Sequence, residues 1–91
     1  MTYAQAAKLL RMMSTERRLE IVALLAKSDE ALPSTFIAAR LMIPDNQISE
    51  NLLKLADCGL LLRTASGNNR FYTLNRGLYQ ELIGFITQKG L

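Results

Sequence analysis

The chain has 91 residues, of which 49% are apolar and 21% are charged, and its formal net charge at pH 7 is +3. This length suits one small globular domain, which buries roughly 60–65% of the surface that the unfolded chain exposes. The single cysteine, Cys58, excludes an intramolecular disulfide. The absence of histidine excludes nucleophile–histidine catalysis and removes the commonest ligand of zinc.

Neither a membrane span nor a secretory signal is expected. The longest apolar run, Ile21 to Ala26, is far shorter than the roughly 18–20 residues that cross a bilayer. The first residues, Met1 to Gln5, lack the basic start of a signal peptide. We therefore expect a reduced, cytoplasmic protein. No glycine-rich phosphate loop or cluster of metal ligands is present, so the sequence predicts no enzyme, no catalytic residues, no metal site and no cofactor.

Helical periodicity fills the first two thirds of the chain. We expect a first helix over residues 2–13 that Thr2 can cap, and a second that is capped by Ser14 or Thr15 and continues to about Lys27. After a polar loop, Leu32-Pro33 predicts a short extended segment, because a residue that precedes proline avoids the α region.

The next two predicted helices form a helix-turn-helix. The first begins at Pro33 or Ser34 and passes through Leu41, and Ile43-Pro44 then forces a turn. The second begins at Asp45 or Asn46. Its apolar residues have the spacing of one buried stripe that ends at a glycine stop, namely Ile48, Leu52, Leu55, Ala56 and Gly59.

A two-stranded ribbon and a final helix complete the prediction. Leu60–Thr64 and Arg70–Leu74 are prone to form strands, and Ala65–Asn69 between them is a predicted turn that contains glycine and asparagine. A last helix is expected over residues 76–88. This order of elements is that of a winged helix-turn-helix domain over residues 1–91, mainly α, with about five helices and a two-stranded wing.

Three stretches carry a closer resemblance. Met13–Leu25 has an Arg-Leu-x-Ile core after a capping turn, and Ile48–Leu60 has a hydroxyl residue, regularly spaced leucines and a final Gly-Leu. Arg70–Leu74 ends with an aromatic pair, a threonine and a leucine. Over nearly its whole length the chain thus resembles ArsR-type winged helix-turn-helix regulators. The resemblance implies a homodimeric transcriptional repressor that binds a specific double-stranded DNA sequence.

The chain departs from the members of that family that sense metals or oxidants. Metal sensors carry a cysteine pair at the start of the third helix, or aspartate and histidine ligands on the last helix. Here the third helix begins with Pro33–Phe36, and histidine is absent. Oxidation sensors need two cysteines, whereas Cys58 stands alone and is predicted to be a small buried apolar residue. We therefore expect regulation that does not depend on a metal.

The resemblance implies that the fourth helix reads bases in the major groove and that the wing contacts the backbone. Polar side chains at the start of this helix can form directed hydrogen bonds with base edges, and wing arginines suit phosphate. The alternative is that these side chains only form a solvated helix face and an ordinary surface hairpin. The predicted DNA-binding residues are Ser34, Asn46, Gln47, Ser49, Glu50, Asn51, Lys54, Arg63, Asn68, Asn69 and Arg70.

The distribution of charge supports a competing hypothesis. Residues 31–59 carry a net charge of −1, whereas residues 1–30 carry +1 and residues 60–91 carry +3. The expected reading helix is therefore not basic, and Leu53 points out of its apolar stripe close to Glu50. An exposed apolar patch there would favour a winged-helix module that binds a protein partner in place of DNA.

The arginines that begin the second helix have two interpretations. Arg17 and Arg18 can contact the DNA backbone. Alternatively, they form ion pairs with Glu16 and Glu20, which lie close by on the same helix.

The two terminal helices, residues 2–13 and 76–88, carry more apolar surface than a core of this size can absorb. A symmetric dimer is the commonest way to cover such a surface, and the resemblance implies the same interface. The alternative is that these helices only complete the core of a monomer. A dimer would present two reading helices about 34–36 Å apart to a pseudo-palindromic site. The predicted interface residues are Tyr3, Ala7, Leu10, Leu78, Leu82, Phe85 and Ile86.

Overall fold

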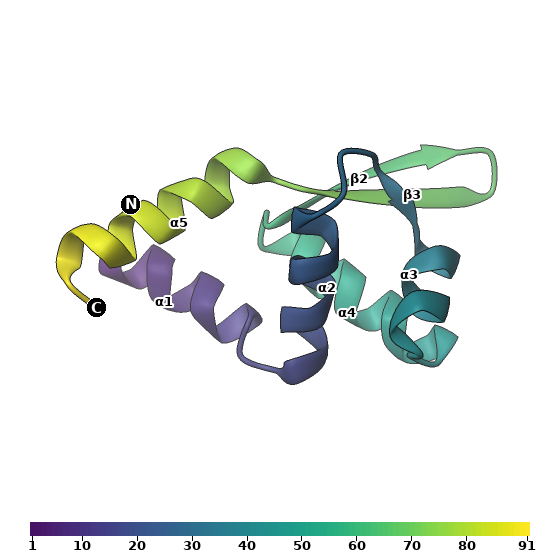
Figure 1. Cartoon of the computed structure of the whole chain (residues 1–91), viewed down its shortest axis with the longest axis horizontal. Coiled ribbons are helices and arrows are strands. Elements are labelled where there is room, and N and C mark those ends of the chain that lie inside the picture. Colours follow the sequence, from purple (N-terminus) through teal and green to yellow (C-terminus); the bar gives the residue numbers. More distant parts are fainter.

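The computed structural model describes residues 1–91 and contains five helices and three short strands (Figure 1). The fold is mainly α with a β-hairpin, as predicted. The elements are α1 (Tyr3–Met12), α2 (Glu16–Ala26), β1 (Leu32–Pro33), α3 (Ser34–Leu41), α4 (Asp45–Asp57), β2 (Leu61–Ser66), β3 (Asn69–Leu74) and α5 (Arg76–Lys89).

Side chains that satisfy free backbone groups determine where the first helices begin. Thr2 forms a capping box with Gln5 at the start of α1, and the Thr15 hydroxyl accepts a hydrogen bond from a backbone N–H in the first turn of α2. The caps at Thr2 and Thr15 were predicted and are confirmed. Helices α3 and α4 instead follow Pro33 and Pro44, which make no side-chain cap.

The turn of the helix-turn-helix is tight. Met42 ends α3 in the left-handed conformation, with φ +56° and ψ +43°, and the Ile43 N–H donates to the carbonyl of Ala38 at 3.0 Å. Pro44 then starts α4. The predicted break at Ile43-Pro44 is confirmed.

The hairpin differs from the prediction in its turn. A five-residue turn over Ala65–Asn69 is wrong, because β2 continues to Ser66 and β3 starts at Asn69, so that only Gly67 and Asn68 connect the strands. Gly67 has φ +62°, whereas the φ of Asn68 is not positive. Positive φ at the first central residue alone marks a type II′ turn. This turn matches the strand twist, so the ladder extends further than expected.

The sheet also has a third strand. Leu32 of β1 pairs with Tyr72 of β3 in an antiparallel arrangement, which gives the strand order β1-β3-β2. The extended segment at Leu32-Pro33 was predicted, but its pairing was not. It ties the base of the hairpin to the start of α3.

One apolar core of 17 buried residues joins all the major elements, and no polar or charged residue is buried in it. The stripe predicted on α4 is confirmed for Ile48, Leu52 and Leu55, which are at most 2% exposed. Ala56 and Gly59 are half-buried at its margin.

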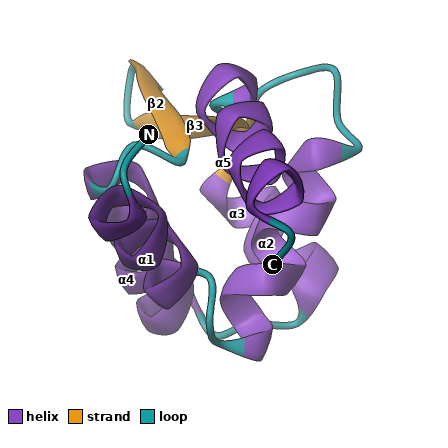
Figure 2. Ribbon diagram, turned by 90° about the vertical axis from the view of Figure 1, so that its left-hand side faces the viewer, coloured by secondary structure: helices purple, strands orange, loops and turns teal.

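The molecule is elongated, with principal extents of 41 × 22 × 21 Å. Helices α1 and α5 lie together with both chain termini at one end, and the β2–β3 hairpin projects from the other (Figure 1). Figure 2 views the molecule from the end that carries α1 and α5, which stand in front of the other elements. None of the helices combines the length and apolar character that a bilayer crossing requires.

Candidate nucleic-acid interface

Helix α4, called the recognition helix below, presents a polar face to solvent. Its apolar stripe points into the core, and Asn46, Gln47, Ser49 and Glu50 are all exposed in its first two turns. Asn46, Ser49, Glu50 and Leu53 follow the spacing i, i+3, i+4 and i+7, which places them in one outward row. Leu53 is 37% exposed. The helix therefore offers hydrogen-bonding groups along a solvent-facing row.

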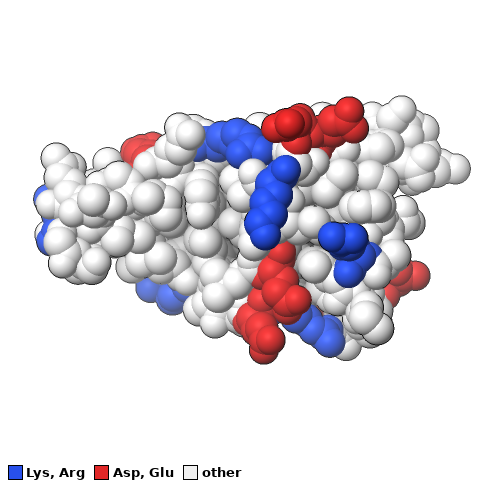
Figure 3. All heavy atoms as spheres, viewed as in Figure 1, with Lys and Arg blue, Asp and Glu red and all other residues white.

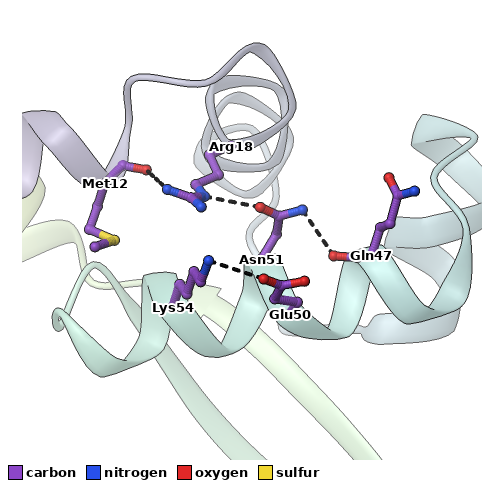
Figure 4. Close-up of polar contacts among 6 residues, drawn as sticks. All are labelled: Met12, Arg18, Gln47, Glu50, Asn51 and Lys54. Atoms are coloured by element: carbon purple, nitrogen blue, oxygen red, sulfur yellow. Dashed lines mark hydrogen bonds and ion pairs between the residues drawn. The ribbon is translucent and has the colours of Figure 1, made fainter.

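The recognition helix carries an ion pair on its surface. Lys54 Nζ lies 3.1 Å from Glu50 Oε1, and the two side chains are 45% and 66% exposed (Figure 4). A pair this exposed adds less than about 1 kcal/mol to stability. Its larger effect is electrostatic, because Glu50 neutralises Lys54, the basic residue of a helix that also carries Asp45 and Asp57.

Asn51 differs from the other predicted base-reading residues. Its side chain is half-buried between α2 and α4. Its Oδ1 accepts a hydrogen bond from Nε of Arg18 at 3.0 Å, and its Nδ2 donates to the Gln47 carbonyl at 2.9 Å (Figure 4). Arg18 Nη1 also donates to the Met12 carbonyl at 3.4 Å. Both ends of the Asn51 amide are therefore occupied inside the chain.

Neither arginine at the start of α2 forms the ion pair that was considered for it. Arg17 is exposed, and Arg18 contacts Asn51 and Met12 instead of a carboxylate. The two ion pairs of the structure are Lys54 with Glu50 and the terminal amine with Glu81. Pairing with Glu16 or Glu20 is thus wrong in this structure.

The hairpin, called the wing below, carries both of its arginines on one face. Arg63 is paired across the ladder with Tyr72, and Arg70 with Ala65. Because directly opposed residues share a face of the ladder, Arg63 and Arg70 lie on the same face as diagonal neighbours. The typical distance between the backbones of such neighbours is about 7–8 Å. Asn68 and Asn69 are exposed at the tip, where they were predicted.

Ser34, the remaining predicted DNA contact, lies elsewhere. It is the first residue of α3 and is half-buried next to β1. The structure therefore brings the α4 residues together in one row and the arginines onto one face of the wing, and leaves Ser34 apart at the start of the preceding helix.

The terminal helices use part of their apolar surface within one chain. Of the seven predicted interface residues, Leu82 and Phe85 belong to the core, with exposed fractions of 0% and 8%. Tyr3 packs edge-on against Phe85, with ring centroids 5.3 Å apart, and Lys89 Nζ lies 5.3 Å from the Tyr3 ring centroid. Ala7, Leu78 and Ile86 are half-buried, and Tyr3 and Leu10 are 64% and 41% exposed.

An exposed apolar residue at this end was absent from the predicted interface. Ile83 of α5 is 43% exposed, and it stands between the half-buried Tyr79 and Ile86 at i, i+4 and i+7 spacing. The signal was present in the sequence, because the last helix has two adjacent apolar stripes. The predicted interface took the stripe of Leu78, Leu82 and Phe85, which faces the core in the structure.

Arg76, the first residue of α5, forms a contact that could not be predicted from the sequence. Its guanidinium donates to the carbonyls of Ala26 and Ser28 at 3.1 and 2.8 Å, and to that of Leu25 at 3.4 Å. These carbonyls lie at the C-terminal end of α2, where a cation is also favoured by the helix dipole. Part of the positive charge of residues 60–91, that of Arg76, is therefore used in a contact within the fold.

The other charged and ligating groups do not gather into a cluster. Figure 3 shows acidic and basic side chains alternating across the middle of one face, without a continuous basic surface there. No three cysteine, aspartate or glutamate side chains come together as a metal-binding group. Cys58 was expected to be buried but is half-buried, and its Sγ donates to the Leu55 carbonyl at 3.2 Å.

No protein-family model matches the chain, and no curated protein sequence matches it. Solved structures do match. HlyU from Vibrio cholerae is 27% identical, with a TM-score of 0.76 over 97% of this chain and 95% of that one. An ArsR-like transcriptional regulator from Rhodococcus is 24% identical, with a TM-score of 0.82 over 97% and 81%. Mb0332 from Mycobacterium bovis, described as a homodimeric winged helix-turn-helix DNA-binding domain, is 22% identical, with a TM-score of 0.76 over 96% and 80%. The chain therefore has the winged helix-turn-helix fold of ArsR-type transcriptional regulators, and the resemblance predicted from its sequence is confirmed.

Proposed function

We propose that the chain is a homodimeric transcriptional repressor that binds a specific double-stranded DNA sequence without the help of a metal. The observation that carries this proposal is the outward polar row of the recognition helix beside a wing whose two arginines share one face. A helix of this kind fits the major groove, and its first turns reach base edges. Similarity to the ArsR-like transcriptional regulator and to the DNA-binding domain of Mb0332 supports a DNA-binding regulator.

The contacts divide by their chemistry. Asn46, Gln47 and Ser49 form hydrogen bonds with base edges, and Glu50 accepts from cytosine N4 where a cytosine faces it. Arg63 and Arg70 contact phosphates, with the asparagines of the wing tip beside them. Ser34 and Lys54 add backbone contacts. Because the protein contributes few cations, the affinity falls with salt less steeply than for a strongly basic repressor.

Dimerisation joins the ends of two molecules that carry α1 and α5. The exposed Tyr3 and Leu10 with the half-buried Ala7 on α1, and Ile83 with Ile86 on α5, supply the apolar contact. Two recognition helices then reach successive major grooves of a pseudo-palindromic site. Occupancy of that site excludes other proteins from the same duplex, which is the basis of the proposed repression.

The competing hypothesis is that the recognition helix binds a protein partner through Leu53 and its acidic residues. Exchange of Glu50 and Leu53 for lysine separates the two. A DNA-binding helix keeps or gains affinity for DNA when it becomes more basic. A protein-binding helix loses its partner instead, and the wild type then shows no preferred DNA sequence.

The experiment that tests the proposal is selection of duplexes from fragmented genomic DNA by the purified protein at low salt, followed by sequencing. We expect an enriched inverted repeat with half-sites about 10–10.5 base pairs apart, centre to centre. The same selection with a chelator present gives the same repeat if no metal is needed. Recovery of no sequence above background contradicts the proposal. A promoter that overlaps the recovered repeat is expected to be transcribed less when the protein is present.

A further inference from the structure

One side chain links the recognition helix to the end of α1 by hydrogen bonds. Arg18, in the first turn of α2, donates through Nε to Asn51 of α4 and through Nη1 to the carbonyl of Met12, the last residue of α1 (Figure 4). Its own backbone N–H is held by Thr15 Oγ1 at 3.3 Å. Arg18 therefore connects three helices.

Asn51 is oriented to receive this arginine. Its Nδ2 donates to the carbonyl of Gln47, four residues earlier on α4, so its Oδ1 is turned toward Arg18. Bidentate recognition of adenine needs both the oxygen and the nitrogen of the amide. Here both atoms already have partners within the chain, and the side chain is half-buried. Asn51 is thus placed for a contact between helices.

The Met12 carbonyl is among the last four of α1, which lack partners within a helix. A hydrogen bond to a guanidinium satisfies such a group and carries the added strength of a charged donor. The planar guanidinium has several N–H groups in a fixed fork, so it can bind Met12 and Asn51 at once, whereas a lysine ammonium is a point charge on a flexible stem. The contact is therefore specific to arginine.

We infer that Arg18 is a positioning residue. With Asn51 it holds the recognition helix in a fixed relation to α1, and it thereby sets the spacing at which a dimer presents its two recognition helices to DNA. This inference rests on the proposed function, since α1 supplies part of the proposed dimer interface. It assigns Asn51 to positioning and leaves base readout to Asn46, Gln47, Ser49 and Glu50.

The test measures tolerance of half-site spacing. Affinity is determined for the selected repeat and for the same repeat with one base pair inserted at its centre, which rotates one half-site by roughly a tenth of a turn. For the wild type we expect a preference for the natural spacing of about tenfold or more. In Arg18→Ala and in Asn51→Ala we expect this ratio to fall to about twofold, and the double variant to lose no more than either single variant.

Matched variants separate the contact from charge and from folding. Arg17→Ala removes the same charge from the same turn, where the side chain is exposed, and is expected to keep the wild-type ratio. Arg18→Lys keeps the charge but not the fork, and is expected to behave like Arg18→Ala. A loss of folded protein lowers the affinity for both duplexes equally and leaves the ratio unchanged. Asn51→Asp keeps an oxygen for Arg18, so it retains the ratio while binding more weakly overall.

The free protein supplies a second measurement that does not need DNA. We expect backbone amides of α4 to exchange with solvent several times faster in Arg18→Ala than in Arg17→Ala, with α5 little changed. If the wild type selects no DNA sequence, the proposed function fails and amide exchange alone decides the positioning role. Suppose instead that the wild type binds a repeat. The inference is then overturned if Arg18→Ala keeps the wild-type ratio of affinities for the two spacings, or if Asn51→Ala changes the preferred base at one position. In both cases the proposed function stands.

Discussion

Met42 occupies a backbone conformation that costs free energy. Its φ of +56° lies in the left-handed region, which is unfavourable by roughly 1–2 kcal/mol for a residue with a side chain, and which glycine adopts readily. The side chain is 88% exposed, so it adds little packing. We expect Met42→Gly to raise Tm by about 2–6 °C in thermal unfolding, because the relief of strain exceeds the entropy that glycine loses on folding.

Lys27 supplies the control for this change. It is also an exposed residue at the end of a helix, but its φ is −88°. Lys27→Gly adds freedom to the unfolded chain without relieving strain, so we expect an unchanged or lower Tm. If Met42→Gly lowers Tm as well, the strain assigned to the helix-turn-helix turn is wrong.

Under the proposed function, we expect Glu50 to limit the affinity of the recognition helix for DNA. It lies 3.1 Å from Lys54 and also repels phosphate. We expect Glu50→Gln to tighten DNA binding about 3- to 10-fold at low salt and to steepen the dependence of affinity on salt by about one unit of log–log slope, because Lys54 becomes free to contact a phosphate. A fluorescence titration at several salt concentrations measures both quantities.

Glu30→Gln is the matched control, since it makes the same change of charge in the loop between α2 and β1. Its effect on DNA binding should be small. Weaker binding by Glu50→Gln would mean that the hydrogen bond from Glu50 to a cytosine outweighs its repulsion of phosphate, and the preferred base at that position would then change with the substitution.

The sequence predicted individual contacts only where a local pattern contained them. The outward residues of α4 and the wing arginines followed from helix and strand periodicity. The partners of Arg18 and Arg76 did not, because each contact joins segments that are distant along the chain. Asn51 was consequently predicted as a base-reading residue, although in the structure it faces α2.

The two arginines of the wing lie close together. Arg63 and Arg70 share a face of the β2–β3 ladder, so both can approach the same stretch of backbone. We expect Arg63→Ala and Arg70→Ala each to weaken DNA binding about 3- to 10-fold and to reduce the salt slope by about one, with similar losses on specific and unrelated duplexes. Competition titrations with the two kinds of DNA provide the measurement.

Two comparisons identify the role of the wing. Lys27→Ala removes a cation at the end of α2 and should leave the salt slope nearly unchanged. Asn46→Ala, on the recognition helix, should reduce discrimination between duplexes more than it reduces overall affinity. If the wing variants change base preference but not the salt slope, the arginines read bases in the minor groove rather than phosphates.

Element boundaries were largely predictable because capping residues and prolines fix them. The start of each of the first four helices lies within one residue of a cap or proline identified in the sequence. The turn of the hairpin was harder to predict. Gly67 and the asparagines beside it suit several turns, and the two-residue turn emerges only when the full ladder of β2 and β3 is formed. Pairing of β1 with β3 is a tertiary contact that local propensity does not encode.

Exposed apolar side chains on the terminal helices bear on the oligomeric state of the protein. Leu10 and Ile83 are 41% and 43% exposed at the end that carries α1 and α5. We expect the double variant Leu10→Glu/Ile83→Glu to sediment as a folded monomer and to bind the selected repeat about 100-fold or more weakly, because the two half-sites are no longer bound together. Analytical ultracentrifugation and circular dichroism test the assembly and the fold separately.

Leu19→Glu is the corresponding control, since it places a carboxylate on an apolar residue of α2 that is 50% exposed. It should remain a dimer. A double variant that stays dimeric would move the interface to another face. A wild type that is already monomeric at micromolar concentration would contradict the proposed assembly.

The burial of Leu82 and Phe85 shows what composition alone could not determine. The sequence predicts an excess of apolar residues on the terminal helices, but it does not show which stripe covers the core and which stays open. Tyr3, Phe85 and Lys89 pack together across α1 and α5, and this packing decides which apolar stripe is covered within the chain. The surface left for a second chain is therefore narrower than the sequence suggested.

Asn75 fixes the backbone at the base of the hairpin through its hydrogen bonds. Its backbone N–H donates to the Leu60 carbonyl at 2.8 Å and its side-chain amide to the Gly59 carbonyl at 3.0 Å, while its Oδ1 caps α5 by accepting from Leu78. Extra residues can therefore be accommodated only at the distal loop. A two-residue turn is kept there only when each insertion adds one residue to each strand. The projection of the hairpin beyond the core thus lengthens in discrete increments of one residue pair.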